Sequence, residues 1–177
     1  MSRSALLVTD MITAYDFEDA EAVAEHAPGP VERIAELVAR AGDEDTLVVF
    51  VNDNYGNWNG SRDDVLERAL DGAHPELVDP IRPEHGHPFV WKPRHSAFYE
   101  TSLNYLLRQH DVERVVLTGQ VAEQCILYTA LDAYIRHFEI VVPADAVVPI
   151  HPHLADAALE MMRVNMRAET PAASEVG

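Results

Sequence analysis

The sequence predicts an α/β protein in which helices cover both faces of a parallel β-sheet. Two observations predict this class: short, continuous apolar runs that are typical of strands buried on both faces, and helical patterns that separate those runs. Because neighbouring parallel strands need a long connection that usually packs as a helix, the alternation predicts a three-layer α/β/α sandwich. The patterns themselves leave the strand order open.

The expected elements follow one another along the whole chain. The apolar runs expected to form strands are 5–8, 46–51, 88–91, 114–118 and 139–142. The segments with helical periodicity are 30–41, 63–70, 101–110 and 152–166, and a further helix is expected to carry Cys125. Pro30 and Gly42 mark the start and end of the first helix, as proline and glycine commonly do. The segment 55–86 is longer than a usual connection, so we expect a lid or a subunit contact there.

Length, charge and cysteine content limit the kinds of protein that this can be. The 177 residues are expected to form one domain, 1–177, which is large enough to bury a substantial core. The net charge of −17, from 13 basic and 30 acidic residues, disfavours nucleic acid and anionic membranes as partners. One cysteine forms no internal disulfide, and every apolar run falls short of the roughly 18 residues that a membrane span needs. We therefore expect a cytoplasmic protein with a small-molecule substrate.

Polar residues follow four of the predicted strands at their carboxyl ends, where open parallel sheets bind ligands. The first run leads to Asp10, the second to Asn52 and Asp53, and the third to Lys92. The fourth passes through a glycine into the helix that carries Cys125. We expect these side chains to share one edge of the sheet.

A thiol, an ammonium group and a carboxylate are a sufficient set for covalent catalysis. The thiol needs a proton acceptor, for which Asp10 is available, and its thiolate needs a positive neighbour, for which Lys92 is available. Cys125 lies in the first turn of a helix, whose amides favour negative charge, so we expect its thiol to ionise easily. The alternatives are ordinary ones: a cysteine that only packs, a helix-capping aspartate and a surface lysine.

Other catalytic interpretations find little support in the sequence. Nine histidines include the pairs His85 with His87 and His151 with His153, but neither pair has an acidic or cysteine ligand at a metal-binding spacing. A phosphatase of the haloacid dehalogenase type would need a second aspartate where the chain has Ile12. No P-loop, GxSxG, GxGxxG or CxxC motif occurs. We expect neither a metal nor a cofactor.

Four segments of the chain carry the residues discussed above: LLVTDM around Asp10, VFVNDN around Asp53, VWKPRHSAF around Lys92 and VVLTGQVAEQC leading to Cys125. Together they resemble the motifs of the isochorismatase-like cysteine hydrolases, which include nicotinamidases and carbamoylsarcosine amidohydrolases. The resemblance covers nearly the whole chain. It implies a Rossmann-like, six-stranded parallel sheet in the order 3-2-1-4-5-6, with its sixth strand near 167–170.

The resemblance also implies a mechanism. Asp10 takes the proton of Cys125, Lys92 stabilises the thiolate, and the thiolate attacks an amide, carbamoyl or related carbonyl to form a thioester. Asp10 then protonates the leaving amine and activates the water that releases the acid. The peptide bond between Gln120 and Val121 is expected to be cis, and the amides of Val121 and Cys125 are expected to form an oxyanion hole. Self-association as a homodimer or homotetramer is a further expectation.

Departures from the family pattern limit what the sequence says about the substrate. Asp53 is followed by Asn54 and Tyr55, so the Asp-x-His metal motif of nicotinamidases is missing. Ile12 stands where many members have glutamine, and Ala122 stands where threonine is frequent. Two alternatives stay open: a vinyl-ether hydrolase of the isochorismatase type, and a ligand-binding protein without turnover. The residues expected to line the substrate pocket are Tyr15, Phe17, Asn52, Asp53, Trp58, Phe98 and Ala122.

Overall fold

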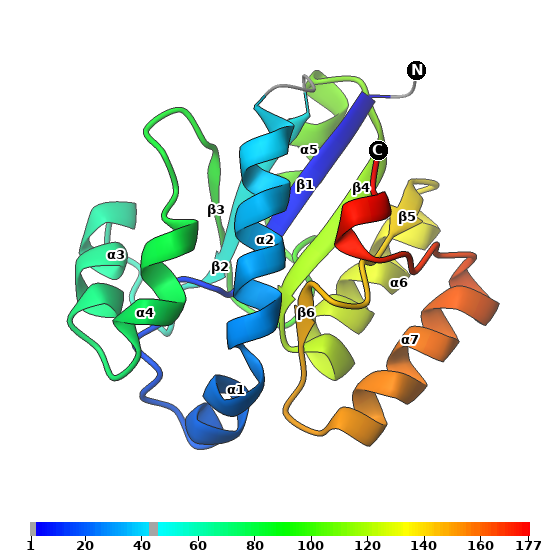
Figure 1. Cartoon of the computed structure of the whole chain (residues 1–177). Helices are drawn as coiled ribbons and strands as arrows, with labels where there is room; N and C mark the ends of the chain where they lie inside the picture. The colour runs from blue at the N-terminus through cyan, green and yellow to red at the C-terminus, as the bar shows by residue number, and fades with distance from the viewer. Residues whose placement is uncertain (1–2, 43–45) are drawn as a thin grey trace.

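The computed structural model describes residues 3–42 and 46–177 and shows one parallel sheet with helices on both faces (Figure 1). The strands are β1 Arg3–Thr9, β2 Leu47–Asp53, β3 Phe89–Lys92, β4 Val112–Gln120, β5 Glu139–Val141 and β6 Val147–Val148. Their order is β3-β2-β1-β4-β5, and β6 pairs with β4. Every strand pairing is parallel. The predicted fold class and the five predicted strands are confirmed.

The sixth strand lies at a different place in the chain from the one expected. It is β6, which pairs with the end of β4 at Gly119 and Gln120, directly beyond the β4–β5 pairing. The expected segment 167–170 does lie beside β5, but it contributes one isolated bridge, between Val141 and Glu169. Arg167 has a left-handed conformation that ends the preceding helix, and a proline, which has no backbone N–H, follows at 171. A longer strand therefore has no room to form there.

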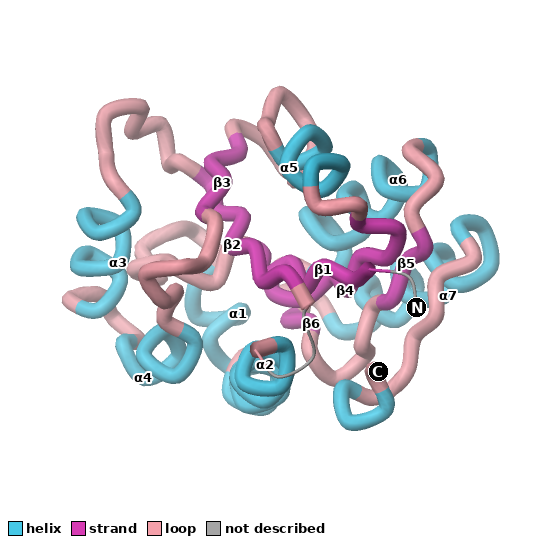
Figure 2. Tube along the Cα trace, turned by 90° about the horizontal axis from the view of Figure 1, so that it is seen from above, coloured by secondary structure: helices cyan, strands magenta, loops and turns pink. Residues whose placement is uncertain are grey.

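Helices form the two outer layers of the sandwich (Figure 2). They are α1 Ala20–His26, α2 Pro28–Ala41, α3 Arg62–Leu70, α4 Pro75–Val78, α5 Leu103–Gln109, α6 Leu127–Ile135 and α7 Pro152–Met166. Figure 2 shows α1 and α2 on one side of the sheet and α5 and α6 on the other. Shorter turns are the 3₁₀ segments η1 Asp79–Ile81 and η3 Ala173–Glu175, and the π-type turn η2 Ala122–Ile126. The helix that begins at Pro28 starts slightly earlier than expected, because proline is compatible with a first helical turn.

The strands are apolar on both faces because each face packs against a helical layer. In β1, Leu7 faces the cluster formed with α5, α6 and α7, whereas Leu6 faces the cluster formed with α1 and α2. The segment 55–86 contains α3, α4 and η1, and Leu77 and Ile81 are buried in the second cluster. Its role as a lid or subunit contact stays a prediction. Among residues 3–42 and 46–177, no helix combines the length and apolar character needed to cross a bilayer.

Candidate active site

Asp10 is fixed by hydrogen bonds to two neighbouring strands just beyond the end of β1. It has a left-handed conformation, with φ of 55°. Its N–H donates to the carbonyl of Val51 at 2.9 Å, and its carbonyl accepts from Nε2 of Gln120 at 2.7 Å. Its Oδ1 accepts from the N–H of Asp53 at 2.8 Å. Strands β1, β2 and β4 thus hold this one residue in a defined position.

Lys92, the last residue of β3, carries its ammonium group to the same place. Its side chain is 1% exposed, and Nζ lies 2.8 Å from Oδ2 of Asp10 and 3.7 Å from Oδ2 of Asp53. Nζ also donates to the carbonyl of Arg94 at 3.1 Å. The ammonium of Lys92 is therefore buried among oxygen atoms of Asp10, Asp53 and Arg94, and it makes one further contact.

That contact is with the sulfur of Cys125, which lies 3.6 Å from Nζ of Lys92. The chain after β4 first passes very close to β1: Gly119 has φ of 109°, and a Cβ there would lie 2.1 Å from the carbonyl oxygen of Thr9. The peptide bond between Gln120 and Val121 is cis. Turn η2 then presents Cys125 at the start of a helical segment that continues as α6.

Burial controls the protonation of this trio. Burial raises the pKa of Asp10, although the ammonium of Lys92 works against the shift. Burial alone would lower the pKa of Lys92, but the charges of Asp10 and Cys125 raise it overall. Burial and the nearby Asp10 carboxylate raise the pKa of Cys125 to about 12, against a smaller opposing effect of Lys92. The expectation that this thiol ionises easily was therefore wrong.

Burial and the charge of the neighbouring Asp10 explain why the thiol of Cys125 is less acidic than its position at a helix start suggests. A thiolate beside an ionised Asp10 would put two negative charges against one ammonium group in a buried site. The ammonium of Lys92 and the N–H of Asp53 on the two oxygens of Asp10 suit a carboxylate there, and the raised pKa of Cys125 favours its neutral thiol. If the proton moves from Cys125 to Asp10, the total charge of the trio stays the same, so attack by sulfur and proton transfer can occur together. The raised pKa of Asp10 makes its carboxylate a better acceptor for that proton.

Comparison with known proteins gives this arrangement a context. The isochorismatase domain model matches residues 4–174. The chain belongs to the isochorismatase family. It is 32% identical to the uncharacterized isochorismatase family protein YaaI of Bacillus subtilis over 165 residues, which cover 93% of this chain and 91% of YaaI.

Two further comparisons involve proteins named for an activity. The ureidoacrylate amidohydrolase RutB of Methylorubrum extorquens is 32% identical over 170 residues, 81% of this chain and 68% of RutB. The crystal structure of N-carbamoylsarcosine amidase from Thermoplasma acidophilum superposes with a TM-score of 0.75 at 28% identity, covering 98% of both chains.

The other pocket residues expected from sequence fall into two groups in this isochorismatase-family chain. Asn52, Asp53 and Ala122 lie within the site region: Asn52 holds the backbone of the segment after Asp10, through bonds of 3.1 Å to the N–H and carbonyl of Ile12, and Ala122 opens turn η2. Of the four aromatic residues, Tyr15 and Phe98 are buried in the two core clusters, and the hydroxyl of Tyr15 donates to Oε1 of Gln120 at 3.5 Å. Phe17 stacks on Tyr15 at the surface, and Trp58 is 75% exposed.

Two residues of the site were not recognised from sequence. Gln120 was chosen only for its peptide bond, yet its side chain holds the carbonyl of Asp10. His95 was not singled out at all, although its Nδ1 lies 3.8 Å from the sulfur of Cys125. The available signal was its position three residues after Lys92, in the loop that leaves the same strand end.

The donor set at the end of β2 does not fit the metal site of the family's nicotinamidases. Asn54 and Tyr55 follow Asp53, and neither is the histidine that the motif requires. Across residues 3–42 and 46–177 no group of three or more His, Cys, Asp or Glu side chains is arranged to hold a metal ion. We therefore assign no step to a metal.

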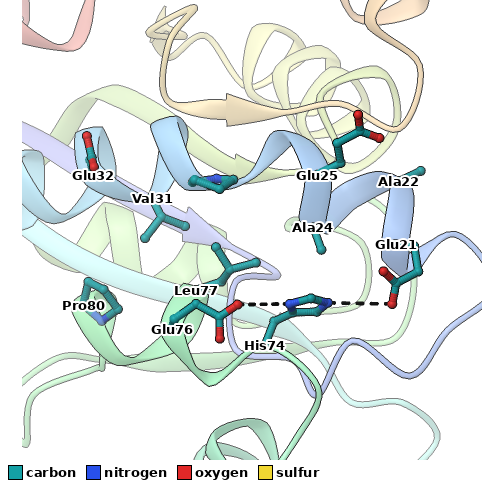
Figure 3. Close-up of a pocket in the computed structure, with 11 residues that line it drawn as sticks. Glu21, Ala22, Ala24, Glu25, Val31, Glu32, His74, Glu76, Leu77 and Pro80 are labelled. Atoms are coloured by element: carbon teal, nitrogen blue, oxygen red, sulfur yellow. Dashed lines mark hydrogen bonds and ion pairs between the residues drawn. The ribbon is translucent and has the colours of Figure 1, made fainter.

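A hollow of about 750 Å³ lies away from the cysteine, between α1, α2 and α4 (Figure 3). Figure 3 shows the ring of His74 between two carboxylates, with Nδ1 3.1 Å from Glu76 and Nε2 3.7 Å from Glu21. Val31 and Leu77 contribute apolar surface to its lining. Asp10, Lys92 and Cys125 do not line it, so this hollow is separate from the cluster that those three residues form.

Proposed function

We propose that this protein is a cysteine-dependent hydrolase of a small-molecule amide, carbamoyl or related C–N bond. The observation that carries the proposal is the position of the Cys125 sulfur, 3.6 Å from Lys92 and close enough to Asp10 for a side-chain hydrogen bond. Three segments far apart in sequence supply these groups, and each group has a distinct use in acyl transfer.

Acylation begins with the neutral thiol. The proton of Cys125 moves to Asp10 as the sulfur attacks the substrate carbonyl carbon, and Lys92 stabilises the negative charge that passes through the sulfur. The tetrahedral intermediate then collapses, the C–N bond breaks, and Asp10 returns the proton to the leaving nitrogen. The products of this half-reaction are a free amine and a thioester on Cys125, with Asp10 again ionised.

An oxyanion hole formed by the amides of Val121 and Cys125 is part of the proposal. The backbone of Val121 already makes a hydrogen bond with the thiol, which lowers the pKa of Cys125 slightly against the larger effects of burial and Asp10. A backbone donor aimed at the reacting sulfur lies close to the place where a carbonyl oxygen would develop negative charge. Donors of this kind are preorganised, because the backbone does not rearrange during the reaction.

The substrate class is supported by the relatives. RutB and the maleamate amidohydrolase of Pseudomonas putida, which is 30% identical over 164 residues, are both named for hydrolysis of an amide-type bond in a small molecule. N-carbamoylsarcosine amidase is named for the same kind of chemistry. Because Tyr55 stands where the Asp-x-His metal motif of nicotinamidases has its histidine, nicotinamide is a less suitable candidate than these compounds.

The test is a substrate panel with two enzymes. Wild type and Cys125→Ala are incubated with maleamate, ureidoacrylate, N-carbamoylsarcosine and nicotinamide, and release of ammonia is measured. Turnover by wild type that disappears in a folded Cys125→Ala variant is the expected result, together with a thioester adduct on Cys125 in quenched samples. Equal turnover by the two proteins would end the proposal.

The same variant tests the vinyl-ether alternative, because protonation by an aspartate does not need the thiol. Turnover of a vinyl ether that survives in Cys125→Ala would favour that reaction instead. The predicted homodimer or homotetramer and the cytoplasmic location stay proposals. Analytical ultracentrifugation and cell fractionation test them.

A further inference from the structure

The side chain of Gln120 links the segment that carries Asp10 to the segment that carries Cys125. Its Nε2 donates to the backbone carbonyl of Asp10 at 2.7 Å, and its Oε1 accepts from the hydroxyl of Tyr15 at 3.5 Å. We propose that Gln120 is a positioning residue that sets the place of the Asp10 carboxylate relative to the sulfur, and that Tyr15 orients Gln120 for this role. The inference rests on the proposed function, in which Asp10 takes the proton of the thiol.

The backbone of Asp10 needs support from its neighbours because it has a left-handed conformation. Its φ is 55°, in a region that is less favourable for residues with a side chain and that persists where the surrounding structure enforces it. On the β2 side, its N–H donates to the carbonyl of Val51. On the β4 side, Gln120 holds its carbonyl. Without the second bond, the peptide group between Asp10 and Met11 has more freedom to rotate, and the carboxylate moves with it.

The backbone of Gln120 is itself fixed by the sheet. Gln120 is the last residue of β4, and it pairs with Val148 of β6, the strand whose place in the chain differs from the expected one. The next residue, Val121, opens turn η2, which leads to Cys125. Gln120 and Tyr15 are both buried, so solvent competes little for their hydrogen bonds. The end of β4 therefore carries both the start of turn η2 and the support of Asp10.

Tyr15 determines which way the amide of Gln120 points. A carbonyl oxygen only accepts hydrogen bonds, so the amide nitrogen must face Asp10 and the amide oxygen is left for the phenol. Burial raises the pKa of Tyr15, with a further contribution from the charge of Glu76, so the hydroxyl keeps the proton that it donates. An edge-on contact with the ring of His74, at 5.3 Å between the ring centroids, fixes the phenol ring. Tyr15, which the sequence placed in the substrate pocket, thus acts through Gln120.

A displaced Asp10 should change two properties of the thiol at once. Acylation needs the carboxylate within hydrogen-bond reach of the proton that it accepts, so displacement slows this step. Burial and the Asp10 carboxylate raise the pKa of Cys125, so displacement of the carboxylate also makes the thiol more acidic. A more acidic thiol would by itself react faster at neutral pH. Slower acylation by a more acidic thiol is therefore the signature of a misplaced proton acceptor.

The variant Gln120→Met tests the proposal, because methionine is similar in length but has no amide. The ester p-nitrophenyl acetate acylates a reactive thiol and releases nitrophenolate, so the rate of the first rapid release measures acylation. We expect acylation about 10-fold slower than in wild type, and thiolate absorbance that appears at lower pH.

The matched control is Thr118→Val, which removes another buried hydrogen bond between β4 and β1. Oγ1 of Thr118 donates to the carbonyl of Leu7 at 2.8 Å, and neither residue contacts the thiol or the carboxylate. The acylation rate and the thiol pKa of Thr118→Val should therefore match those of wild type. A loss of acylation in this control as large as in Gln120→Met would show that any loosening between the two strands has the same effect, and would overturn the inference.

A double-mutant cycle with Asp10→Asn separates positioning from a general loosening of the fold. Once the carboxylate is absent, Gln120 has nothing to position, so Gln120→Met should slow acylation by less than about 2-fold in the Asp10→Asn background. Tyr15→Phe removes only a hydroxyl and should show a smaller slowing with the same dependence on Asp10. It takes the place of Gln120→Met in the cycle if that variant does not fold.

The outcomes distinguish the inference from the proposed function. Equal slowing by Gln120→Met in the wild-type and Asp10→Asn backgrounds, or no slowing in the wild-type background, would overturn the inference alone. A wild-type burst no larger than that of Cys125→Ala would instead remove the proposed function, and the inference with it.

Discussion

The ammonium of Lys92 lies 2.8 Å from the carboxylate of Asp10, and both side chains are almost excluded from solvent. Taking two charges out of water costs more than a surface ion pair would, so the pair is not explained as a contribution to stability. A third group, the thiol of Cys125, touches the same ammonium. The arrangement is better understood as a charge-balanced site that is ready to move one proton.

Removal of one partner of this ion pair should destabilise the fold strongly. Lys92→Met leaves the Asp10 carboxylate buried without its counter-charge, and we expect a loss of about 3–5 kcal/mol in the free energy of unfolding, measured by urea titration. The double variant Asp10→Asn with Lys92→Met should recover much of this loss while remaining inactive. If Lys92→Met unfolds at the wild-type urea concentration, the buried charge pair is not as the structure describes it.

Replacement of Asp10 by asparagine should lower the pKa of the Cys125 thiol, even though Asp10 is the proposed acceptor of the thiol proton. The Asp10 carboxylate is one of the causes that raise the thiol pKa to about 12, and Lys92 opposes it. Asp10→Asn removes the negative charge and leaves the ammonium, so the thiolate should form at lower pH than in wild type. The measurement is thiolate ultraviolet absorbance against pH, with Cys125→Ala subtracted for each background. A higher thiol pKa in Asp10→Asn would contradict the electrostatic account.

The sequence was most informative where the local pattern determines the structure. Leu6 and Leu7 face opposite layers of the sandwich, so a continuous apolar run correctly indicated a strand buried on both faces. The carboxyl ends of parallel strands meet at one edge, and for this reason Asp10, Lys92 and the cysteine after β4 could be grouped from their positions after the apolar runs.

The errors and omissions arose where spatial context decides the outcome. Helix position alone indicated an acidic thiol, but burial and the neighbouring carboxylate, which are tertiary properties, have the larger effect on Cys125. His95 escaped notice because its contact with sulfur depends on how its loop is tied to α6. Among the aromatic residues, Phe98 and Trp58 each follow a strand that ends at the site, yet one is buried in the core and the other is exposed. Sequence spacing does not distinguish these cases.

Gly119 should be intolerant of any side chain. A Cβ at this position would lie 2.1 Å from the carbonyl oxygen of Thr9, and φ of 109° disfavours residues other than glycine. Gly119→Ala should therefore separate β1 from β4 at the site and destabilise the fold by more than about 3 kcal/mol, measured by thermal or urea unfolding. Gly86→Ala is the matched control, because a Cβ there would meet nothing within 4 Å and the φ of Gly86 is not positive. Equal stability of the two variants would contradict the close approach of the strands.

Glu123 should be needed to hold turn η2 against α7. From turn η2, its Oε1 accepts from the backbone N–H groups of Ile150 at 3.1 Å and His151 at 2.6 Å, directly before α7 begins. Glu123→Ala leaves both donors without this acceptor, which should cost about 1–3 kcal/mol and increase amide hydrogen exchange at Ile150 and His151. Glu123→Gln keeps an acceptor oxygen but loses the charge that a helix N-terminus favours, so an intermediate loss is expected.

The control for Glu123 is Glu160→Ala, which removes an exposed glutamate of α7 that pairs with Arg163 on the surface. An exposed pair of this kind contributes at most about 1 kcal/mol, so exchange at Ile150 and His151 should not change. The decisive comparison is the pattern across the three variants. If Glu123→Ala and Glu123→Gln lower the free energy of unfolding equally, the charge of Glu123 matters and its hydrogen bonds do not. If neither variant changes hydrogen exchange at the amides of Ile150 and His151, Glu123 does not hold the start of α7. Because Cys125 lies only two residues after Glu123, a loosened contact with α7 should also slow acylation of the thiol. The rapid first release of nitrophenolate from the ester p-nitrophenyl acetate measures this acylation.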